Sequence, residues 1–139
     1  NSRNIIPDKV HFTVDIRSWD DNLAIKAWDL VKKDFQQIAE QRGCPIRIEE
    51  TWRVEHSPFD EKLVQNILDT ADNLGYSSLH MVSGAGHDAS YMNQIAPTAM
   101  IFVPSIGGRS HVEVEDTKWE DCEAGTNVLL HSILNSAQE

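Results

Sequence analysis

The chain has 139 residues, which is the size of one ordinary domain or of two smaller pieces. Its hydrophobic content of 40% and its charged content of 24% are those of a globular protein and exclude a disordered or fibrous chain. With 22 acidic against 12 basic residues, and a net charge of -10, it lacks the basic footprint of a nucleic-acid-binding protein, so no nucleic-acid partner is expected.

Cysteine usage and hydropathy favour a cytoplasmic protein without a membrane partner. Cys44 and Cys122 lie far apart and lack CxxC spacing, so both are predicted to be free thiols in a reducing compartment. No apolar run approaches the roughly 20 residues of a membrane helix. The opening NSRNIIPDKV has no apolar core of signal-peptide length and does not begin with Met, so we expect the chain to begin inside a longer protein.

The first part of the chain predicts a strand, a helix and a second strand. Residues 9–17 and 46–54 alternate between apolar and polar side chains, which is typical of half-buried strands. Asp20 and Asp21 suit the start of the helix between them, and Gly43 suits its end. Two strands are too few for a stable sheet, so further strands or a covering element are expected. The apolar residues of the helix recur at three- and four-residue steps: Ala24, Ala27, Trp28, Val31, Phe35 and Ile38.

A boundary is predicted at residues 56–60, where a second helix begins. Ser57 suits its N-cap, Pro58 its first position and Gly75 its end. Its apolar face is expected to consist of Leu63, Val64, Ile67, Leu68 and Ala71.

The rest of the chain predicts two buried strands and two further helices. Residues 79–82 form a short apolar run, and residues 98–103 form an unbroken one, which indicates a buried strand. A short helix is expected near Asp88, and Thr117 with Glu120 suits a capping box for the last helix. The order α-β-α-β-α is typical of part of an α/β sheet covered by helices. The apolar residues of the last helix are Ala124, Val128, Leu130, Ile133 and Leu134.

Two glycine-rich loops carry the candidate site histidines. His111 ends the loop SIGGRSH and is followed by acidic residues, and a neutral imidazole near carboxylates is a good metal ligand. His87 follows Gly84 and Gly86 in SGAGHDA, where a backbone can approach a carboxylate or an oxyanion closely. The alternative for His111 is a surface histidine in a polar loop. The alternative for SGAGHDA is a structural turn in which His87 caps the following helix. HExxH and the GK[ST] of a phosphate-binding loop are absent, so the local pattern leaves both alternatives open.

Polar residues of the first part are further candidates. Arg17 lies at the exit of the first strand, and its guanidinium suits a two-point contact with a carboxylate. The alternative, which the residues alone favour, is a salt bridge to Asp15, Asp20 or Asp21. Asn4 precedes the strand, and the alternative to a site role for it is that of a plain turn residue.

A serine nucleophile is a separate hypothesis. Ser83, Ser105 and Ser110 lie near the two histidines, and Asp88 or Asp116 could orient a base. The GxSxG elbow of serine hydrolases is absent, however.

Taken in order, these motifs resemble a known family. Asn4-Ile-Ile-Pro, Asp15-Ile-Arg17, SGAGHDA and MIFVPSxxGxSHxxxE resemble the hydantoinase/carbamoylase branch of the dinuclear-metal M20 amidohydrolases. This branch holds N-carbamoyl-L-amino-acid hydrolases, β-ureidopropionase and allantoate amidohydrolase. The resemblance covers nearly the whole chain and implies metal-dependent hydrolysis of a linear C–N amide or ureido bond, an activity of the EC 3.5.1 type.

The resemblance also implies an α/β fold of two domains. Residues 1–57 match half of a four-stranded α/β lid domain, through which the intact enzyme forms a homodimer. Residues 58–139 match the last α-β-α-β-α segment of the catalytic metallohydrolase domain. The segment Val112-Glu113-Val114 departs from the Pro-containing segment that many members have after the ligand histidine.

Residue roles follow from the resemblance. His111 matches the last metal ligand of a site for two divalent ions, Zn or Mn, with Co or Ni as other candidates. Asn4 and Arg17 match lid residues that bind the carboxylate of a small ureido or carbamoyl substrate. Gly86, through its backbone, and His87 match residues of the substrate pocket.

The rest of the family's site has no counterpart in the sequence. There is no HxD motif, and no residue of the chain matches the catalytic Glu that serves as general base; both are expected upstream. The chain is therefore expected to be a C-terminal fragment that is inactive alone. The alternative is a non-catalytic dimerising or ligand-binding fragment.

Overall fold

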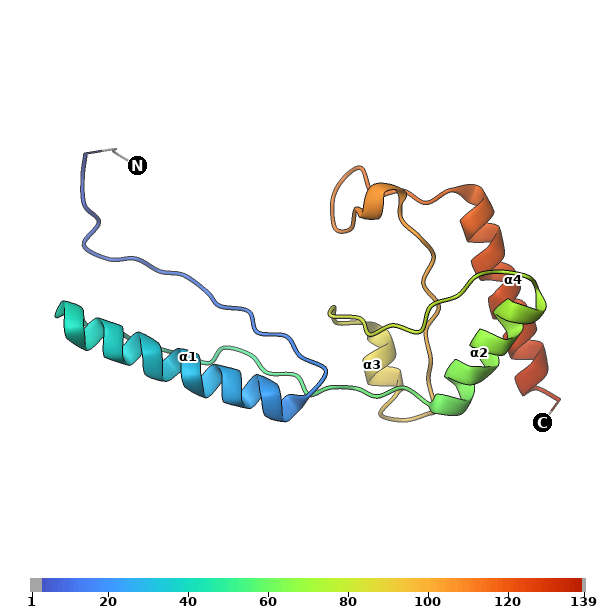
Figure 1. The fold of residues 1–139 in the computed structure, drawn as a ribbon, viewed down its shortest axis with the longest axis horizontal. Helices are drawn as coiled ribbons and strands as arrows, with labels where there is room; N and C mark the ends of the chain where they lie inside the picture. Colours follow the sequence, from blue (N-terminus) through green and yellow to red (C-terminus); the bar gives the residue numbers. More distant parts are fainter. Residues whose placement is uncertain (1–3, 139) are drawn as a thin grey trace. The chain divides into compact units, whose positions relative to one another are not determined.

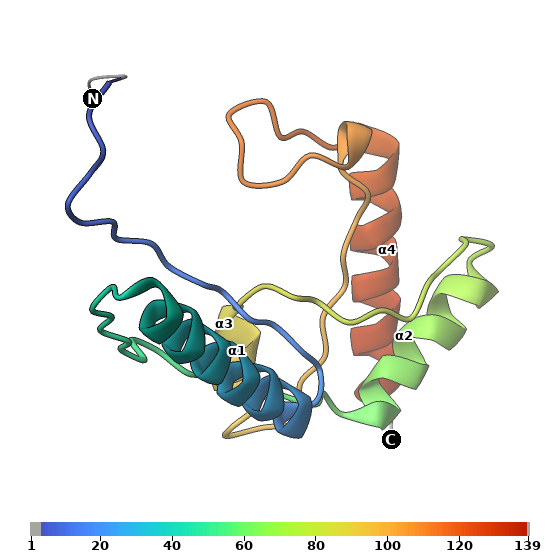
Figure 2. The same cartoon turned by 60° about the vertical axis from the view of Figure 1, so that its left-hand side comes forward.

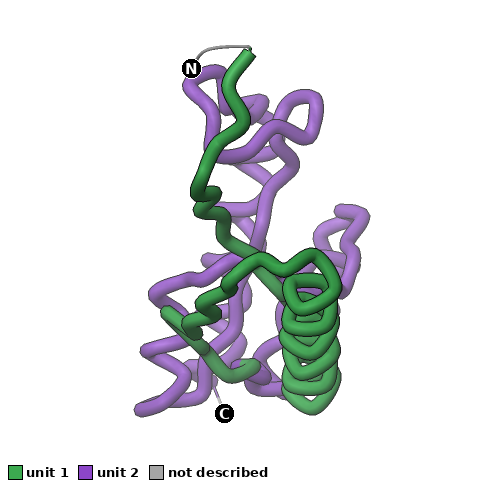
Figure 3. The backbone as a smooth tube through the Cα atoms, turned by 90° about the vertical axis from the view of Figure 1, so that its left-hand side faces the viewer, with its two compact units in different colours: residues 1–56 green, residues 57–139 purple. Residues whose placement is uncertain are grey.

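The structure is a computed structural model that describes residues 4–138. It divides into two compact units, residues 1–56 and residues 57–139, which Figure 3 draws in different colours. Across the described residues the regular structure is helical, and none is assigned to a strand. In the same range no helix is long and apolar enough to span a bilayer. Cys44 and Cys122 are free, as predicted.

The first unit is built on α1, Asp21–Arg42 (Figure 1). The Asp20 carboxylate accepts hydrogen bonds from the backbone amides of Asn22 and Leu23 at 2.8 and 3.2 Å, which caps the helix start. Gly43 ends the helix in the left-handed region with φ 63°, which glycine adopts at little cost. Both predicted ends are confirmed. Of the predicted apolar face, Ile38 is exposed, and the others are half-buried: Ala24, Ala27, Trp28, Val31 and Phe35.

Both segments that flank α1 lie along it. The rings of Phe12 and Phe35 meet edge to face with centroids 5.6 Å apart, and the backbone amide of His56 donates to the Asp21 carboxylate at 2.9 Å. The strand predictions for 9–17 and 46–54 are wrong for this structure, because no described backbone pairs with either segment. A strand is held by the amides and carbonyls of a neighbour, which alternation alone does not supply.

The second unit contains α2, Glu61–Asn73, which begins later than predicted. Asp60 is the N-cap, and its carboxylate accepts from the amides of Lys62 and Leu63 at 3.0 and 2.9 Å. The predicted cap, Ser57, instead accepts a hydrogen bond from the Asn93 side chain at 3.1 Å. A carboxylate both binds these amides and favours the positive end of the helix dipole, so Asp60 is the stronger cap.

The last helix, α4 (Trp119–Ser136), packs against α2, and both views in Figures 1 and 2 show the two side by side. Ala71 of α2 and Val128 of α4 are both buried. Polar side chains also cross the interface between the two helices. The Asn66 amide donates to the Ser132 carbonyl at 2.9 Å, and the Asn135 amide donates to the Thr70 hydroxyl at 3.1 Å.

The predicted capping box of α4 is wrong. The helix begins one residue later, with Lys118 at the N-cap and no side-chain capping bond. The backbone amide of Thr117 donates to the Asp116 carboxylate at 2.9 Å, so this residue belongs to the preceding turn. Glu120 still lies in the first turn, where the partial positive charge of the helix N-terminus attracts its carboxylate. Three residues of the predicted apolar face are exposed: Leu130, Ile133 and Leu134.

The two predicted strands of this unit are also unpaired. Residues 79–82 and 98–103 run as plain ribbon in Figure 1, for the same reason as in the first unit. A short α3 (Asp88–Met92) follows the SGAGHDA loop, as predicted, and a 3-10 turn, η1 (Ile106–Gly108), lies in the second glycine-rich loop.

Residues 98–103 pack closely against α4 at Gly125. A Cβ added there would lie 2.4 Å from Cγ1 of Val103, and the β-branched valine has little rotamer freedom to move away. We expect Gly125→Ala to lower the free energy of unfolding, because overpacking costs about 1–3 kcal/mol and outweighs the helix-propensity gain of about 1 kcal/mol. Urea unfolding of the intact protein measures this.

The matched control removes the obstacle. Val103→Ala should itself lower the free energy of unfolding. The double variant with Gly125→Ala should lower it by less than the sum of the two single changes. Greater stability of Gly125→Ala in the native Val103 background would contradict the contact.

Candidate functional site

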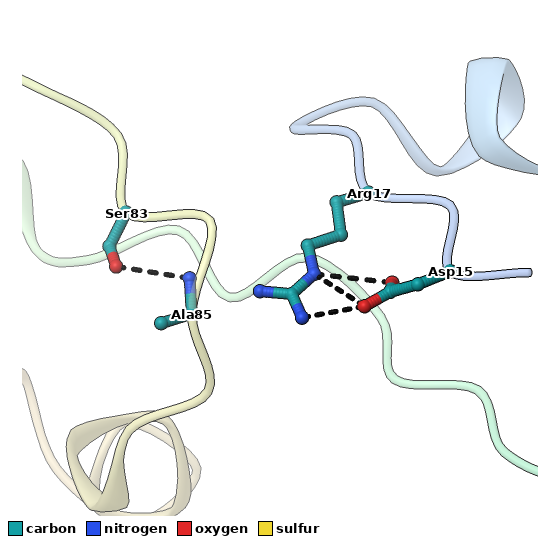
Figure 4. Close-up of polar contacts among 4 residues, drawn as sticks. All are labelled: Asp15, Arg17, Ser83 and Ala85. Atoms are coloured by element: carbon teal, nitrogen blue, oxygen red, sulfur yellow. Dashed lines mark hydrogen bonds and ion pairs between the residues drawn. The ribbon is translucent and has the colours of Figure 1, made fainter. Parts of the chain in front are cut away.

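The SGAGHDA loop joins Ser83 to His87. The hydroxyl oxygen of Ser83 lies 2.7 Å from Nε2 of His87, and both residues are half-buried. The same hydroxyl accepts a hydrogen bond from the backbone amide of Ala85 at 3.2 Å, which Figure 4 shows. The Ser83 hydroxyl therefore contacts both the backbone of this loop, at Ala85, and the ring of His87.

His87 also contacts the neighbouring apolar segment. Its ring meets the ring of Phe102 edge-on, with centroids 5.4 Å apart and planes inclined by 63°. His87 stands at the N-cap position of α3, but its side chain makes no capping hydrogen bond. The alternative in which this side chain caps the helix is therefore wrong, and the ring is held by the serine and the phenylalanine instead.

Gly86 is exposed and has open space beside it. A Cβ built there would meet no atom within 4 Å among the described residues, so their packing does not require glycine at this position. Absence of a side chain leaves the backbone accessible to a bound molecule.

The second glycine-rich loop holds His111 in an unusual backbone conformation. The amide of Ile106 donates to the Asp116 carbonyl at 2.8 Å and closes the loop. Within it His111 has φ 57°, a left-handed value that is uncommon outside glycine. The His111 amide donates to the Glu115 carboxylate at 2.7 Å. Glu115 therefore stabilises this turn through the backbone of the histidine, whose side chain is exposed.

The described residues do not form a metal site by themselves. No three His, Cys, Asp or Glu side chains come together within residues 4–138, and no hydrogen bond or ring contact joins His87 to His111 there. Imidazole is a good ligand for Zn, and Mn prefers oxygen ligands, but a single imidazole does not hold either ion. A surface hollow contains neither histidine; it is lined by Pro104, Ser105, Ile106, Gly107, Lys118 and Asp121.

In the first unit Arg17 forms an ion pair with Asp15. Arg17 Nε donates to both carboxylate oxygens at 3.2 and 3.0 Å, and Nη2 donates to one of them at 2.6 Å (Figure 4). These hydrogen bonds and the positive charge of Arg17 hold the pKa of Asp15 below its usual value. The same hydrogen bonds and the negative charge of Asp15 raise the pKa of Arg17. The predicted salt bridge is therefore formed, with Asp15 as its partner. Asn4 lies in an exposed turn.

The pairing of Ser83 with His87 was not predicted from the sequence. The four-residue spacing across a glycine-rich loop is the signal for this pair, whereas the sequence predicts Ser83 only as a candidate nucleophile. A serine–histidine contact is part of the catalytic triad, yet no described carboxylate bonds to His87 as the third member. Phe102 was predicted only as part of an apolar run.

Comparisons with known proteins cover almost the whole chain. The family model described as peptidase family M20/M25/M40 matches residues 6–135. The chain is 43% identical over 138 residues to an N-carbamoyl-L-amino-acid amidohydrolase of Rhizobium meliloti, and 37% identical over 137 residues to an allantoate amidohydrolase of Bacillus subtilis. Each alignment covers 99% of this chain but 33% of the relative, so the chain spans about a third of their length.

The same similarity extends to solved structures. The crystal structure of an amidase of the hydantoinase/carbamoylase family from Burkholderia multivorans superposes with a TM-score of 0.84 at 40% identity. That match covers 88% of this chain and 30% of the amidase chain. The architecture described above is therefore part of the fold of these amidases.

Proposed function

Because the chain belongs to the peptidase family M20/M25/M40, we propose that the protein carrying it hydrolyses a linear C–N bond in an N-carbamoyl or ureido compound. The observation that carries this proposal is the similarity, over 99% of the chain, to relatives described as an N-carbamoyl-L-amino-acid amidohydrolase and an allantoate amidohydrolase. Both kinds of compound join a ureido group to a carboxylate. The substrate class is therefore a small molecule with these two groups.

The substrate side of the site is assigned to two sets of residues. Arg17, with Asn4, binds the carboxylate, while Gly86 and His87 line the pocket. In support, the Arg17 guanidinium already contacts both oxygens of the Asp15 carboxylate, so its donors can form the two-point contact that a substrate carboxylate needs. The loop of His87 supports its role by leaving the Gly86 backbone open.

The metal side is assigned to His111, as one ligand of a site for two divalent ions, Zn or Mn, with Co or Ni as other candidates. We place the remaining ligands and the general base, a Glu, in the part of the relatives' length that this chain does not span. When bound, such ions polarise a carbonyl and lower the pKa of a bound water. The exposed imidazole of His111, carried by a loop closed at Ile106 and Asp116, supports this role.

We also place residues 1–57 in the lid domain and residues 58–139 in the catalytic domain of a cytoplasmic homodimer. The division of the chain into two compact units, residues 1–56 and residues 57–139, supports separate roles for the two parts.

The intact protein should release ammonia from an N-carbamoyl-L-amino acid or from allantoate. Dialysis against a chelator should abolish the activity, and Zn, Mn, Co or Ni added singly should restore it to different extents. An untreated sample dialysed in parallel is the control. Hydrolysis that survives the chelator and is blocked by a serine-directed reagent would instead support the serine hypothesis.

The alternative is a dimerising or ligand-binding chain without catalytic function. It predicts intact protein that binds metal or substrate without turnover. A metal titration of the 139-residue chain alone separates the cases further, because two tightly bound ions per chain would contradict a site completed by other residues.

A further inference from the structure

We infer that Ser83 is a positioning residue that holds the His87 ring with its proton on Nδ1, so that Nδ1–H is the hydrogen-bond donor presented to the substrate. This inference rests on the proposed substrate-binding role of His87. Its physical basis is the contact between the Ser83 hydroxyl and Nε2 at 2.7 Å. A neutral imidazole has one donor and one acceptor nitrogen, and the partner of one nitrogen decides the state of the other.

The hydrogen bonds of Ser83 indicate the direction of that contact. Its oxygen already accepts from the amide of Ala85 at 3.2 Å, so its own proton needs an acceptor. Among the described residues, Nε2 of His87 is the acceptor within reach, and a donating imidazole would leave this half-buried proton unpaired.

Phe102 restrains the ring in a second direction. It meets the imidazole edge-on at 5.4 Å, while Ser83 holds the ring at Nε2. No described residue bonds to Nδ1, so the proton on this nitrogen is left for a ligand. A carbonyl or carboxylate oxygen of the substrate is the chemical group that such a donor binds.

The test combines kinetics with the protonation state of the ring. In the intact protein labelled with ¹⁵N-histidine, the Nδ1 resonance of His87 should have the chemical shift of a protonated nitrogen. Ser83→Ala should move the ring toward an exchanging mixture of tautomers and lower kcat/KM about tenfold, the effect of one lost hydrogen bond. Ser83→Thr retains a hydroxyl and should restore both. Ser78→Ala, at an exposed serine of the same unit, is the matched control.

The possible outcomes separate the two proposals. Unchanged kcat/KM in His87→Asn would overturn the substrate-binding role itself. If His87→Asn lowers kcat/KM but Ser83→Ala changes neither the tautomer nor the kinetics, the positioning role alone is wrong. Complete loss of turnover in Ser83→Ala, with an unchanged tautomer, would identify the serine as a nucleophile instead. If Ser83→Ala fails to fold, an Nε2–H resonance for His87 in the unmodified protein would by itself overturn the inference.

Discussion

His111→Ala in the intact protein is expected to abolish turnover and to lower the number of divalent ions bound per chain. Loss of an outer partner of a metal-bound histidine typically costs 10–100-fold in affinity or activity. Loss of the ligand itself should therefore exceed about 100-fold. The side chain of His111 is exposed, so its removal should leave the fold intact. Metal analysis of the purified variant and an ammonia-release assay measure the two effects.

Two further variants make this test specific. His111→Asn suits the left-handed backbone at φ 57° better than alanine and should lose activity equally, which excludes a distorted loop as the cause. His131→Ala removes an exposed histidine from α4 and should behave as the unmodified protein. Full activity with an unchanged metal content in His111→Ala would end the assignment of this residue as a ligand.

Arg17→Ala is expected to raise KM about 10–100-fold for substrates that carry a carboxylate. Hydrogen bonds to a charged group contribute about 1.5–3 kcal/mol, and each 1.4 kcal/mol corresponds to a factor of ten. An analogue with a neutral amide in place of the carboxylate should be affected far less. The KM of Arg17→Lys for the carboxylate substrate should lie between those of the unmodified protein and Arg17→Ala, because lysine keeps the charge but loses the two-point geometry.

Arg53→Ala is the matched control for this experiment. Arg53 lies in the same unit and is bound to Glu50 in a similar pair, with Nε 2.6 Å from Oε1. Its removal should leave KM unchanged. If Arg17→Ala raises KM as much for the neutral analogue as for the carboxylate substrate, the arginine supports the local structure and does not bind the carboxylate.

Local signals predicted the helices well. Asp20 and Gly43 mark the ends of α1 because a cap and a left-handed glycine act within one turn of the residues that they terminate. The N-terminal caps of α2 and α4 were misplaced because several polar residues compete there. At α2 Asp60 prevailed over Ser57, and the cap of α4 falls at Lys118.

Non-local partners limited the remaining predictions. The alternation of residues 9–17 is a property of one segment, while a strand depends on the backbone beside it, and no described residue supplies one. The family was nevertheless predictable, because its motifs lie in order along the chain, and the match to residues 6–135 confirms it. The roles of Arg17 and His111 stay predictions.

The hydrogen bonds between α2 and α4 fix how the two helices can slide along each other. A purely apolar interface tolerates a change of register, since one aliphatic contact replaces another. Here a shift by one helical turn, about 5.4 Å, would separate Asn66 from the Ser132 carbonyl and Asn135 from Thr70. Each separated polar group that stayed buried would cost about 1–3 kcal/mol. These amides therefore mainly destabilise alternative alignments of the helix pair, and they contribute less to the free energy of unfolding of the native alignment.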